Sequence, residues 1–238
     1  MSDHVELDWS QTGKKWVSYF DILGFSRFVC ERDPLSVFCT YSMCLEEFRR
    51  HEESHKKWGG LQFIHFSDSF LIFAPDDSAG SFAAIESPSR WFFNFLLQRE
   101  IPVSGAMACD EFYADRANGI FFGKALVEAS KLSESLNWIG FVLCPSAIGK
   151  LSDVGLPADG RLHYRKWNAP VKGKSGVCSL EPTFAYLINH TMNDKNIFVP
   201  LLERMAARIE DPKIKMKYEN TLSFLKHFGV AQPVKAAS

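Results

Sequence analysis

The feature that most constrains this chain is an apolar run that ends on an acid. Residues 17–20 (VSYF) are mostly β-branched or aromatic, which favours a buried strand. Asp21 follows where a strand interior favours another apolar residue, and Gly24 then permits a tight turn. Residues 61–73 (LQFIHFSDSFLIF) predict a hairpin with Asp68 at or near its turn. If the two runs pair in one sheet, two carboxylates meet beside a glycine turn.

Two carboxylates in such a place are suitable ligands for Mg²⁺ or Mn²⁺. Each acid alone also has an ordinary explanation, because Asp21 suits a helix cap and Asp68 suits a hairpin turn. The two together favour a metal site. Residues 22–25 would add backbone N–H groups at the start of a helix, where phosphate binds well. The sequence therefore predicts a site for metal and phosphate, which suits an in-line attack on phosphorus.

The composition predicts a large core and no strong overall charge. Of 238 residues, 46% are hydrophobic, and the net charge is −1. Attraction of the whole chain to nucleic acid or to a membrane is therefore not expected, and no apolar run approaches the ~18 residues of a membrane span. Residues 1–10 contain no signal-peptide core. The six cysteines form no C-x-x-C pair, which predicts reduced thiols, mostly in the core, and a cytoplasmic protein.

The order of apolar patterns predicts an α+β fold, with a central, mostly antiparallel sheet of ferredoxin or palm type and flanking helices. One or two helices are expected at residues 27–50, where Pro34 either breaks the pattern or starts the second helix. Further helices are expected at residues 81–98, 127–136 and, divided by Pro212, 200–228. Further strands are expected at residues 102–108, 138–144 and 177–180, and irregular structure at 111–119 and 149–176. The expected organisation is a tail at 1–14, a catalytic domain at 15–148 and a partly helical C-terminal extension at 149–238.

Three motifs resemble those of class III nucleotidyl cyclases. Residues 20–26 (FDILGFS) are similar to the first metal motif of that family. Residues 66–69 (FSDS) are similar to the second, with serine in place of the usual glycine. Residues 123–132 (GKALVEASKL) resemble the later segment that reaches the partner's active site. Within the family, the motifs and the C-terminal extension are most similar to those of the bacterial pyrimidine cyclases of the Pycsar antiphage system.

The resemblance implies roles for the matching residues. Asp21, Asp68 and the backbone carbonyl of Ile22 match the metal ligands, so the implied cofactor is Mn²⁺ or Mg²⁺. The residues matched to substrate binding are Phe20, Leu23, Gly24, Phe25 and Lys124. Ser104 is a further candidate, and a strand hydroxyl bonded to the backbone is its alternative explanation.

Four further positions depart from the family pattern, so the roles that the resemblance implies do not apply to them unchanged. Lys131 stands where purine cyclases carry a catalytic arginine, and it supplies charge without a two-pronged donor. Val127 stands where they carry an asparagine that positions the ribose. The positions that read a purine align with Ile64 and Ile120, whose side chains cannot hydrogen-bond a base. Adenine and guanine are therefore disfavoured as the specific base.

The implied activity is the conversion of a pyrimidine triphosphate to its 3′,5′-cyclic monophosphate and pyrophosphate, with UTP preferred and CTP as the alternative. A homodimer with shared active sites and a separate effector activated by the cyclic nucleotide in antiphage defence are implied in the same way. Two other hypotheses stay open. One is an inactive nucleotide-binding module, suggested by Val127 and Lys131. The other is a dinucleotide synthase, against which the lack of a GGDEF-like motif around Asp68 counts. The basic residues Lys166, Lys172 and Lys174 are interpreted as a solvated loop.

Overall fold

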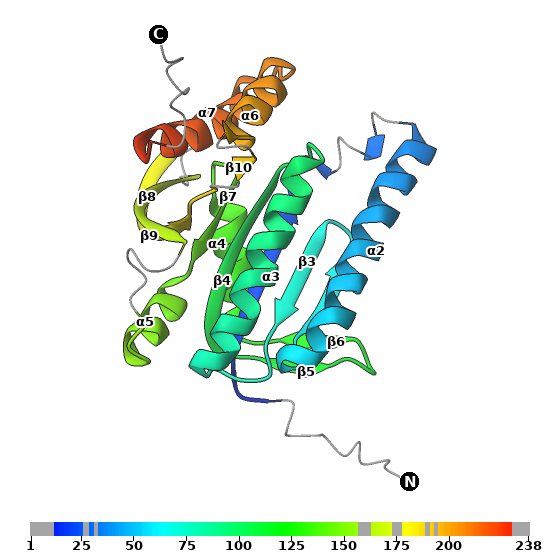
Figure 1. Cartoon of the computed structure of the whole chain (residues 1–238), viewed down its shortest axis with the longest axis vertical. Coiled ribbons are helices and arrows are strands. Elements are labelled where there is room, and N and C mark those ends of the chain that lie inside the picture. Colours follow the sequence, from blue (N-terminus) through cyan, green and yellow to red (C-terminus); the bar gives the residue numbers. More distant parts are fainter. Residues whose placement is uncertain are drawn as a thin grey trace.

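The described part of the chain forms one central sheet with helices on both faces (Figure 1). In this computed structural model, the described residues are 12–25, 29–30, 33–156, 163–172, 178–188, 191–192 and 195–229. The sheet order is β2-β3-β1-β4-β7-β9-β8, and every neighbouring pair is antiparallel except β4 and β7. The bounds are β1 Lys14–Ile22, β2 Gln62–Phe66, β3 Ser69–Phe73, β4 Val103–Glu111, β7 Gly140–Leu143, β8 Tyr164–Lys172 and β9 Cys178–Tyr186. The predicted α+β fold is confirmed.

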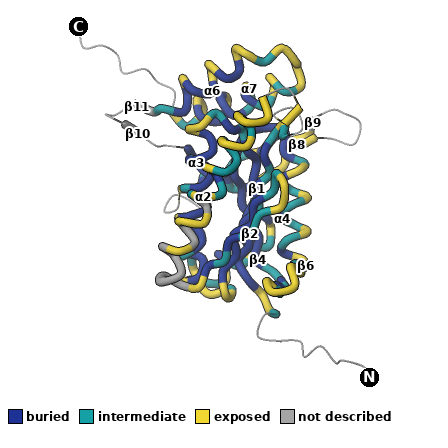
Figure 2. Tube along the Cα trace, turned by 90° about the vertical axis from the view of Figure 1, so that its right-hand side faces the viewer, coloured by how far each residue is buried: buried dark blue, intermediate teal, exposed yellow. Residues whose placement is uncertain are grey.

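The sheet separates two helical layers, as the view in Figure 2 shows. The helices are α2 Pro34–Gly59, α3 Ala79–Gln98 and, on the opposite face, α4 Lys124–Ser135. Two serine pairs identify the faces. Ser89 of α3 donates to Ser18 of β1 at 2.8 Å, whereas Ser104 of β4 lies 3.2 Å from the Ser133 hydroxyl of α4. Because side chains alternate along a strand, and Asp21 is opposite Ser104 in the register, the carboxylate of Asp21 lies on the α4 face.

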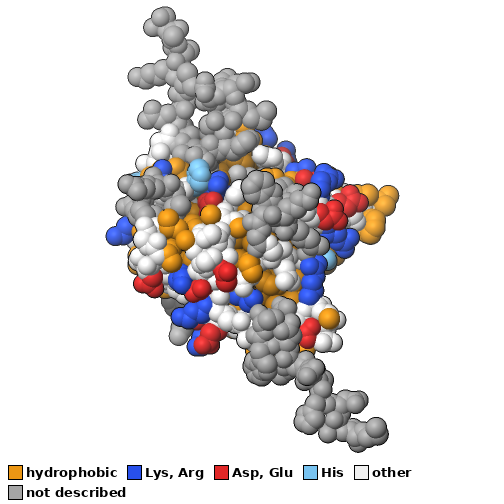
Figure 3. Space-filling view, turned by 60° about the horizontal axis from the view of Figure 1, so that its bottom comes forward, with side chains coloured by type: hydrophobic (Ala, Val, Ile, Leu, Met, Phe, Trp, Pro, Cys, Tyr) orange, Lys and Arg blue, Asp and Glu red, His pale blue; other side chains and the backbone are white. Residues whose placement is uncertain are grey.

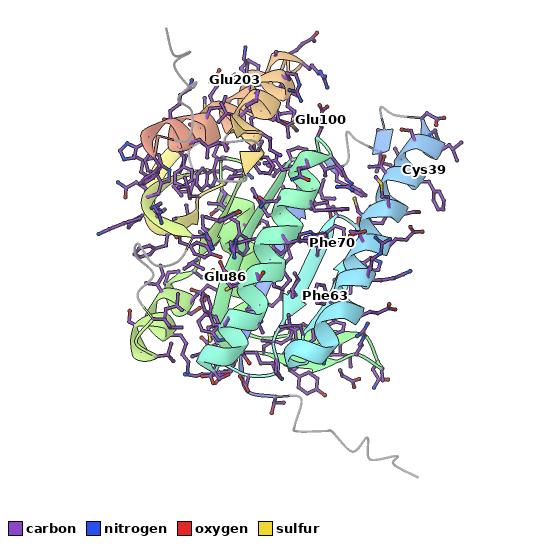
Figure 4. All side chains as sticks on the ribbon, in the orientation of Figure 1. Cys39, Phe63, Phe70, Glu86, Glu100 and Glu203 are labelled. Atoms are coloured by element: carbon purple, nitrogen blue, oxygen red, sulfur yellow. The ribbon has the colours of Figure 1, made fainter. Side chains whose placement is uncertain are left out.

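The predicted helices form, with ends set by identifiable residues. α2 begins at Pro34, where the missing N–H costs nothing, and the Asp33 carboxylate accepts from the Ser36 N–H at 2.9 Å. It ends at Gly60, whose φ of 68° is left-handed. Pro88 lies within α3 and does not end it. Figure 4 shows Phe63 and Phe70 on β2 and β3, in the core between the sheet and these two helices.

Two segments that were expected to be irregular are ordered instead. Within 111–119 and just after it, β5 (Tyr113–Asp115) and β6 (Ile120–Phe122) form a hairpin. Within 149–176, α5 (Pro145–Asp153) continues and β8 forms, paired with β9 along its length. The expectation failed for β5 and β6 because each strand has only three residues, too few for a periodic pattern, and for β8 because exposed polar residues interrupt its apolar ones.

The segment 149–238 is built into the same sheet as the residues before it. β9 pairs with β7, and β8 forms the adjacent edge. The remaining elements are a short hairpin of β10 (Thr191–Met192) and β11 (Lys195–Asn196), and helices α6 (Phe198–Ala207) and α7 (Pro212–His227). α6 and α7 lie across the upper end of the sheet in Figure 1 and confirm the helical prediction that Pro212 divides. The division at 148 stays a prediction, and the tail at 1–11 lies outside the described residues.

Three of the cysteines are in the core as expected, and two are not. Cys44, Cys109 and Cys144 are buried, whereas Cys30 and Cys39 are exposed. Cys39 therefore corrects the expectation of a helix core residue, and Figure 4 shows it on α2. None of the described helices has the length and apolar character needed to cross a membrane.

Gly105 provides a test of the central packing. A Cβ on Gly105 would lie 2.7 Å from Cδ1 of Phe20 and 2.9 Å from Cδ2 of Phe141. We expect Gly105→Ala to lower the free energy of unfolding by about 2 kcal/mol, measured by urea denaturation, because this core cannot take the extra methyl group without strain. The control is Gly149→Ala in α5, where a Cβ meets nothing within 4 Å. Equal stability of the two variants would contradict the packing of Phe20 against Phe141.

Candidate active site

The structure brings Asp21 and Asp68 together at one end of the sheet. Asp21 is the penultimate residue of β1, and Asp68 lies in the turn between β2 and β3. Ser69, the first residue of β3, is directly opposite Asp21 in the register. The N–H of Ile22 donates to the backbone carbonyl of Asp68 at 3.0 Å. The hairpin turn is therefore fixed beside the end of β1, as the sequence predicted for these two runs.

The electrostatic environment of Asp21 suits a cation. Burial, together with the negative charges of Asp68 and Glu134, raises the pKa of Asp21 to about 6. Lys217 and Lys172 act in the opposite direction. A half-buried carboxylate beside like charges favours its protonated form, and a bound cation removes that repulsion.

Two tyrosines support the turn that carries Asp68. The hydroxyls of Tyr19 and Ser69 are 2.7 Å apart, and the Tyr41 hydroxyl donates to the backbone carbonyl of Ser67. Ser67 has a φ of 51°, a conformation that a serine adopts only when its surroundings hold it. Burial raises the pKa of both tyrosines, and the charge of Asp68 adds to this. Sequence reasoning missed both residues, although Tyr19, two positions before Asp21, shares its face by strand alternation.

The predicted phosphate loop is only partly available for binding. The Leu23 N–H donates to the Pro102 carbonyl at 2.9 Å, so this N–H is not free to bind phosphate. The prediction that Leu23 binds phosphate through its backbone N–H is therefore corrected. Gly24 is exposed and has a φ of 74°, which explains the glycine. Among the described residues, nothing accepts from its N–H. Phe25 packs against Tyr41, with 5.8 Å between ring centroids. Ser26 and, of the helix expected after it, residues 27–28 and 31–32 lie outside the described residues.

The donor set fits a magnesium-type cation. Both acids supply carboxylate oxygens, and within the described residues neither side chain accepts a hydrogen bond. In the same part of the chain, no group of three or more His, Cys, Asp or Glu side chains is placed to hold a metal. Mg²⁺ and Mn²⁺ in phosphate-transfer sites are held by one or two carboxylates, with phosphate oxygens and water completing the coordination. Asp21 and Asp68 fit that pattern, and the ligand role of the Ile22 carbonyl stays a prediction.

Two predicted substrate-binding side chains lie in the core. Phe20 is fully buried and stacks on Phe141 with ring centroids 5.0 Å apart. Ser104 is also fully buried, and its hydroxyl lies 3.2 Å from both the carbonyl and the hydroxyl oxygen of Ser133. These positions correct the prediction for both side chains, since neither reaches a ligand at the surface. For Ser104, the alternative of a backbone-bonded strand hydroxyl is the better description.

The two predicted lysines of α4 lie on its exposed surface. Lys124 pairs with Glu111 at 2.9 Å, with both side chains more than half exposed, so the pair adds little stability. Lys131 is exposed and is not among the charges that act on Asp21 in its own chain. Its predicted role at a partner's site is therefore compatible with its position and stays a prediction.

The charges that do reach Asp21 were not found from the sequence. Lys172 was interpreted as part of a solvated loop, but it ends β8 and its Nζ donates to the Glu134 carbonyl at 2.6 Å. Lys174 lies outside the described residues. Lys217 belongs to α7. Burial and the positive charge of Lys172 lower its pKa to about 8, whereas the negative charge of Asp21 acts to raise it. No local pattern could have indicated these residues, because the sheet and α7 bring them to the site from far along the chain.

A cavity of about 400 Å³ adjoins the same loop. Residues 22–25 form one wall, and the other walls come from α2, the end of α3, and helices α6 and α7. Arg208, just after α6, pairs with Glu100, just after α3, at 2.6 Å. Figure 4 shows Glu100 at the same end of the molecule as Glu203 of α6. The C-terminal helices therefore close the space behind the loop.

The raised pKa of Asp21 predicts a gain in stability when its charge is removed from the metal-free protein. The pKa of Asp21 is about 6 in the folded protein and about 3.8 in the unfolded chain, so stability falls as the pH rises through this interval. We expect Asp21→Asn to raise the free energy of unfolding in EDTA at pH 7.5 by about 1 kcal/mol, measured by urea denaturation. In Mn²⁺, the wild-type melting temperature should rise and that of the variant should not.

Asp153→Asn, at the exposed end of α5, is the matched control and should change neither measurement. If Asp21→Asn destabilises the metal-free protein, or keeps the full Mn²⁺ stabilisation, Asp21 does not hold a cation as described.

Comparison with known proteins identifies the fold. No family model and no curated protein matches the sequence. Among solved structures, the adenylyl cyclase CyaB from P. aeruginosa is 17% identical with a TM-score of 0.50, over 77% of this chain and 98% of that one. The catalytic core of a rhodopsin-guanylyl cyclase with converted specificity, in complex with ATPalphaS, is 13% identical with a TM-score of 0.54, over 73% and 95%. The monomeric guanylyl cyclase domain of the RhoGC fusion protein from the aquatic fungus Blastocladiella emersonii is 12% identical with a TM-score of 0.52, over 74% and 96%. The chain therefore has the fold of adenylyl and guanylyl cyclase domains.

Proposed function

We propose that the protein is a nucleotide cyclase of the class III kind. The observation that carries this proposal is the position of Asp21 and Asp68 side by side, next to the exposed Gly24 turn, at the end of the central strand. This arrangement occurs on a fold shared with adenylyl and guanylyl cyclase domains. One of the similar structures is in complex with ATPalphaS, which supports a nucleoside triphosphate as the ligand class.

The residues of the chain would act mainly by positioning. In the reaction, the ribose 3′-oxygen attacks the α-phosphorus, pyrophosphate leaves, and the hydroxyl proton passes to water. A divalent cation at Asp21 and Asp68 would lower the pKa of the 3′-hydroxyl and offset the phosphate charge. The two acids are fixed relative to each other by the pairing of β1 with β3 and by the bond from Ile22 to Asp68. The Tyr19–Ser69 contact keeps the turn in place.

A pyrimidine base is the proposed specificity. In the sequence resemblance, Ile64 on β2 and Ile120 on β6 match the positions that read a purine, and neither side chain offers a hydrogen bond. A purine bound here would therefore receive no hydrogen bond from these two side chains, so the site could not select it in that way. UTP is the proposed substrate and cyclic UMP the product, with CTP as the alternative.

The wider role is proposed from the sequence resemblance. The cyclic nucleotide would act as a second messenger in the cytoplasm, and a separate effector would respond to it in antiphage defence. This role requires turnover, whereas an inactive nucleotide-binding module would bind the triphosphate without releasing product.

The activity is tested with Mn²⁺ and each of the four ribonucleoside triphosphates, with the product identified by mass spectrometry. We expect cyclic UMP from UTP, a slower reaction with CTP, and little product from ATP or GTP. Asp21→Ala and Asp68→Ala should each reduce the rate at least ~10²-fold while the protein stays folded. Asp153→Ala is the control and should keep full activity. A linear dinucleotide or cyclic dinucleotide product would favour the synthase hypothesis, and no product from any triphosphate would favour the binding module.

A head-to-tail homodimer with shared sites is proposed from the sequence resemblance, and the exposure of Lys131 on α4 supports it. Large hydrophobic side chains are exposed on β2, β6 and α4, among them Phe66, Phe122 and Val127. Figure 3, which turns the end with β5 and β6 toward the viewer, shows hydrophobic side chains at the surface between charged ones. Such surfaces suit a protein interface.

Shared sites predict complementation between two inactive variants. A mixed dimer of Asp21→Ala and Lys131→Ala contains one site with both residues intact, since Asp21 and Lys131 come from different chains. After subunit exchange, half of the dimers are mixed, and we expect about a quarter of the wild-type activity. Each variant alone should be nearly inactive. Absence of any recovery, with subunit exchange shown by a tagged copy, would contradict a site shared through Lys131.

A further inference from the structure

Helix α7 is attached rigidly to the sheet near the candidate site. The Ile139 N–H, just before β7, donates to Oγ1 of Thr221 at 2.9 Å. The Asn220 side chain donates to the Asn137 carbonyl at 2.8 Å. Thr221 is fully buried, and Phe224 packs edge-on against Trp138 with ring centroids 5.1 Å apart. These contacts fix the rotation and the height of α7 over the end of the sheet.

This attachment places Lys217 at the loop that follows Asp21. Lys217 is one helical turn before Thr221, whose hydroxyl lies 2.9 Å from the Lys217 carbonyl. Its side chain is half-buried and lines the cavity together with Ile22, Leu23 and Gly24. The charge of Lys217 also acts on Asp21 and lowers the pKa of that carboxyl.

The position of Lys217 has no evident structural purpose. Within the described residues, no carboxylate forms an ion pair with it, although burying a cation without a partner costs free energy. Lys172, on the neighbouring β8, adds a second positive charge and increases the repulsion. A half-buried cation that faces a binding loop, with a second positive charge acting on it, is typical of a site for an anion.

The ligand that is expected at this loop supplies such an anion. A nucleoside triphosphate and the two carboxylates together carry more negative charge than the divalent cations bound between them can balance. Further positive charge must therefore come from the protein. In the proposed dimer Lys131 serves the partner's site, and Lys217 and Lys172 are two cations of the same chain whose charges act on Asp21.

We propose that Lys217 of α7 binds the polyphosphate chain of the substrate at the loop of residues 22–25 in its own subunit, with Lys172 reinforcing the charge. This inference rests on the proposed function for the identity of the substrate. If Lys217 binds phosphate, the C-terminal extension takes a direct part in substrate binding, in addition to extending the sheet and covering its end. A lysine suits the task because its compact charge serves phosphate from several directions.

The test compares Lys217→Met with Lys215→Met, an exposed lysine on the same helix. The probe is inorganic tripolyphosphate with Mn²⁺, which has no ribose and cannot be cyclised, and its binding is measured by isothermal titration calorimetry. We expect Lys217→Met to weaken tripolyphosphate binding about tenfold, as the loss of one charge-assisted hydrogen bond does. Lys215→Met should stay within twofold of the wild type, and Lys217→Arg should recover most of the loss.

Binding of Mn²⁺ alone separates a phosphate-binding role from a structural one. Removing a cation near Asp21 should leave Mn²⁺ binding unchanged or stronger, so the two ligands respond in opposite directions. A folding defect would weaken both, and that outcome, or unchanged tripolyphosphate binding, would overturn the inference.

The activity assays distinguish this inference from the proposed function. If UTP is turned over and Lys217→Met leaves the KM unchanged, the inference is wrong and the cyclase stands. If no triphosphate yields a product while tripolyphosphate binds in a Lys217-dependent way, the inference is supported and the cyclase fails. Failure of the wild type to bind tripolyphosphate overturns the inference.

Discussion

The arrangement depends on the central position of β1, which pairs with β3 on one side and β4 on the other. Its alternate side chains serve two layers. Phe20 is fully buried against α3 and Phe141, whereas Asp21 faces the α4 layer between Ser69 and Ser104 of the neighbouring strands. The same packing that stabilises Phe20 therefore holds Asp21 half-buried beside Asp68. The raised pKa of Asp21 is the consequence, and it makes the end of β1 a favourable place for a cation.

The C-terminal part of the chain completes this end of the molecule. β9 and β8 extend the sheet, and α6 and α7 cover the space behind the loop of residues 22–25. Lys172 and Lys217 reach Asp21 from these elements. In the proposed dimer, each site would then combine two acids and two lysines from one chain with Lys131 from the other. Positive charge would surround the phosphate chain, and the acids would face the metal.

Sequence reasoning was most accurate where one local pattern decided the structure. The strand before Asp21, the hairpin around Asp68 and the start of a helix at Pro34 follow from side-chain alternation, turn chemistry and the fixed φ of proline. It failed at β5 and β6, which are only three residues long, and at β8, whose exposed polar residues conceal the backbone pairing. It also failed to see that the Leu23 N–H is already bonded to Pro102, and it left two explanations of Ser104 open, because the partners of both residues are distant in the chain.

The sequence by itself determined the mostly antiparallel α+β architecture, the two acids and the glycine turn between strand and helix, because each of these depends on neighbouring residues. Only the tertiary structure decided the pKa of Asp21 and which cations act on it. Burial, the register of β1 against β3, and the attachment of α7 through Thr221 set those properties. They arise from contacts between elements far apart in the chain, and electrostatic energy in a half-buried site depends on distance and desolvation, which no local pattern encodes.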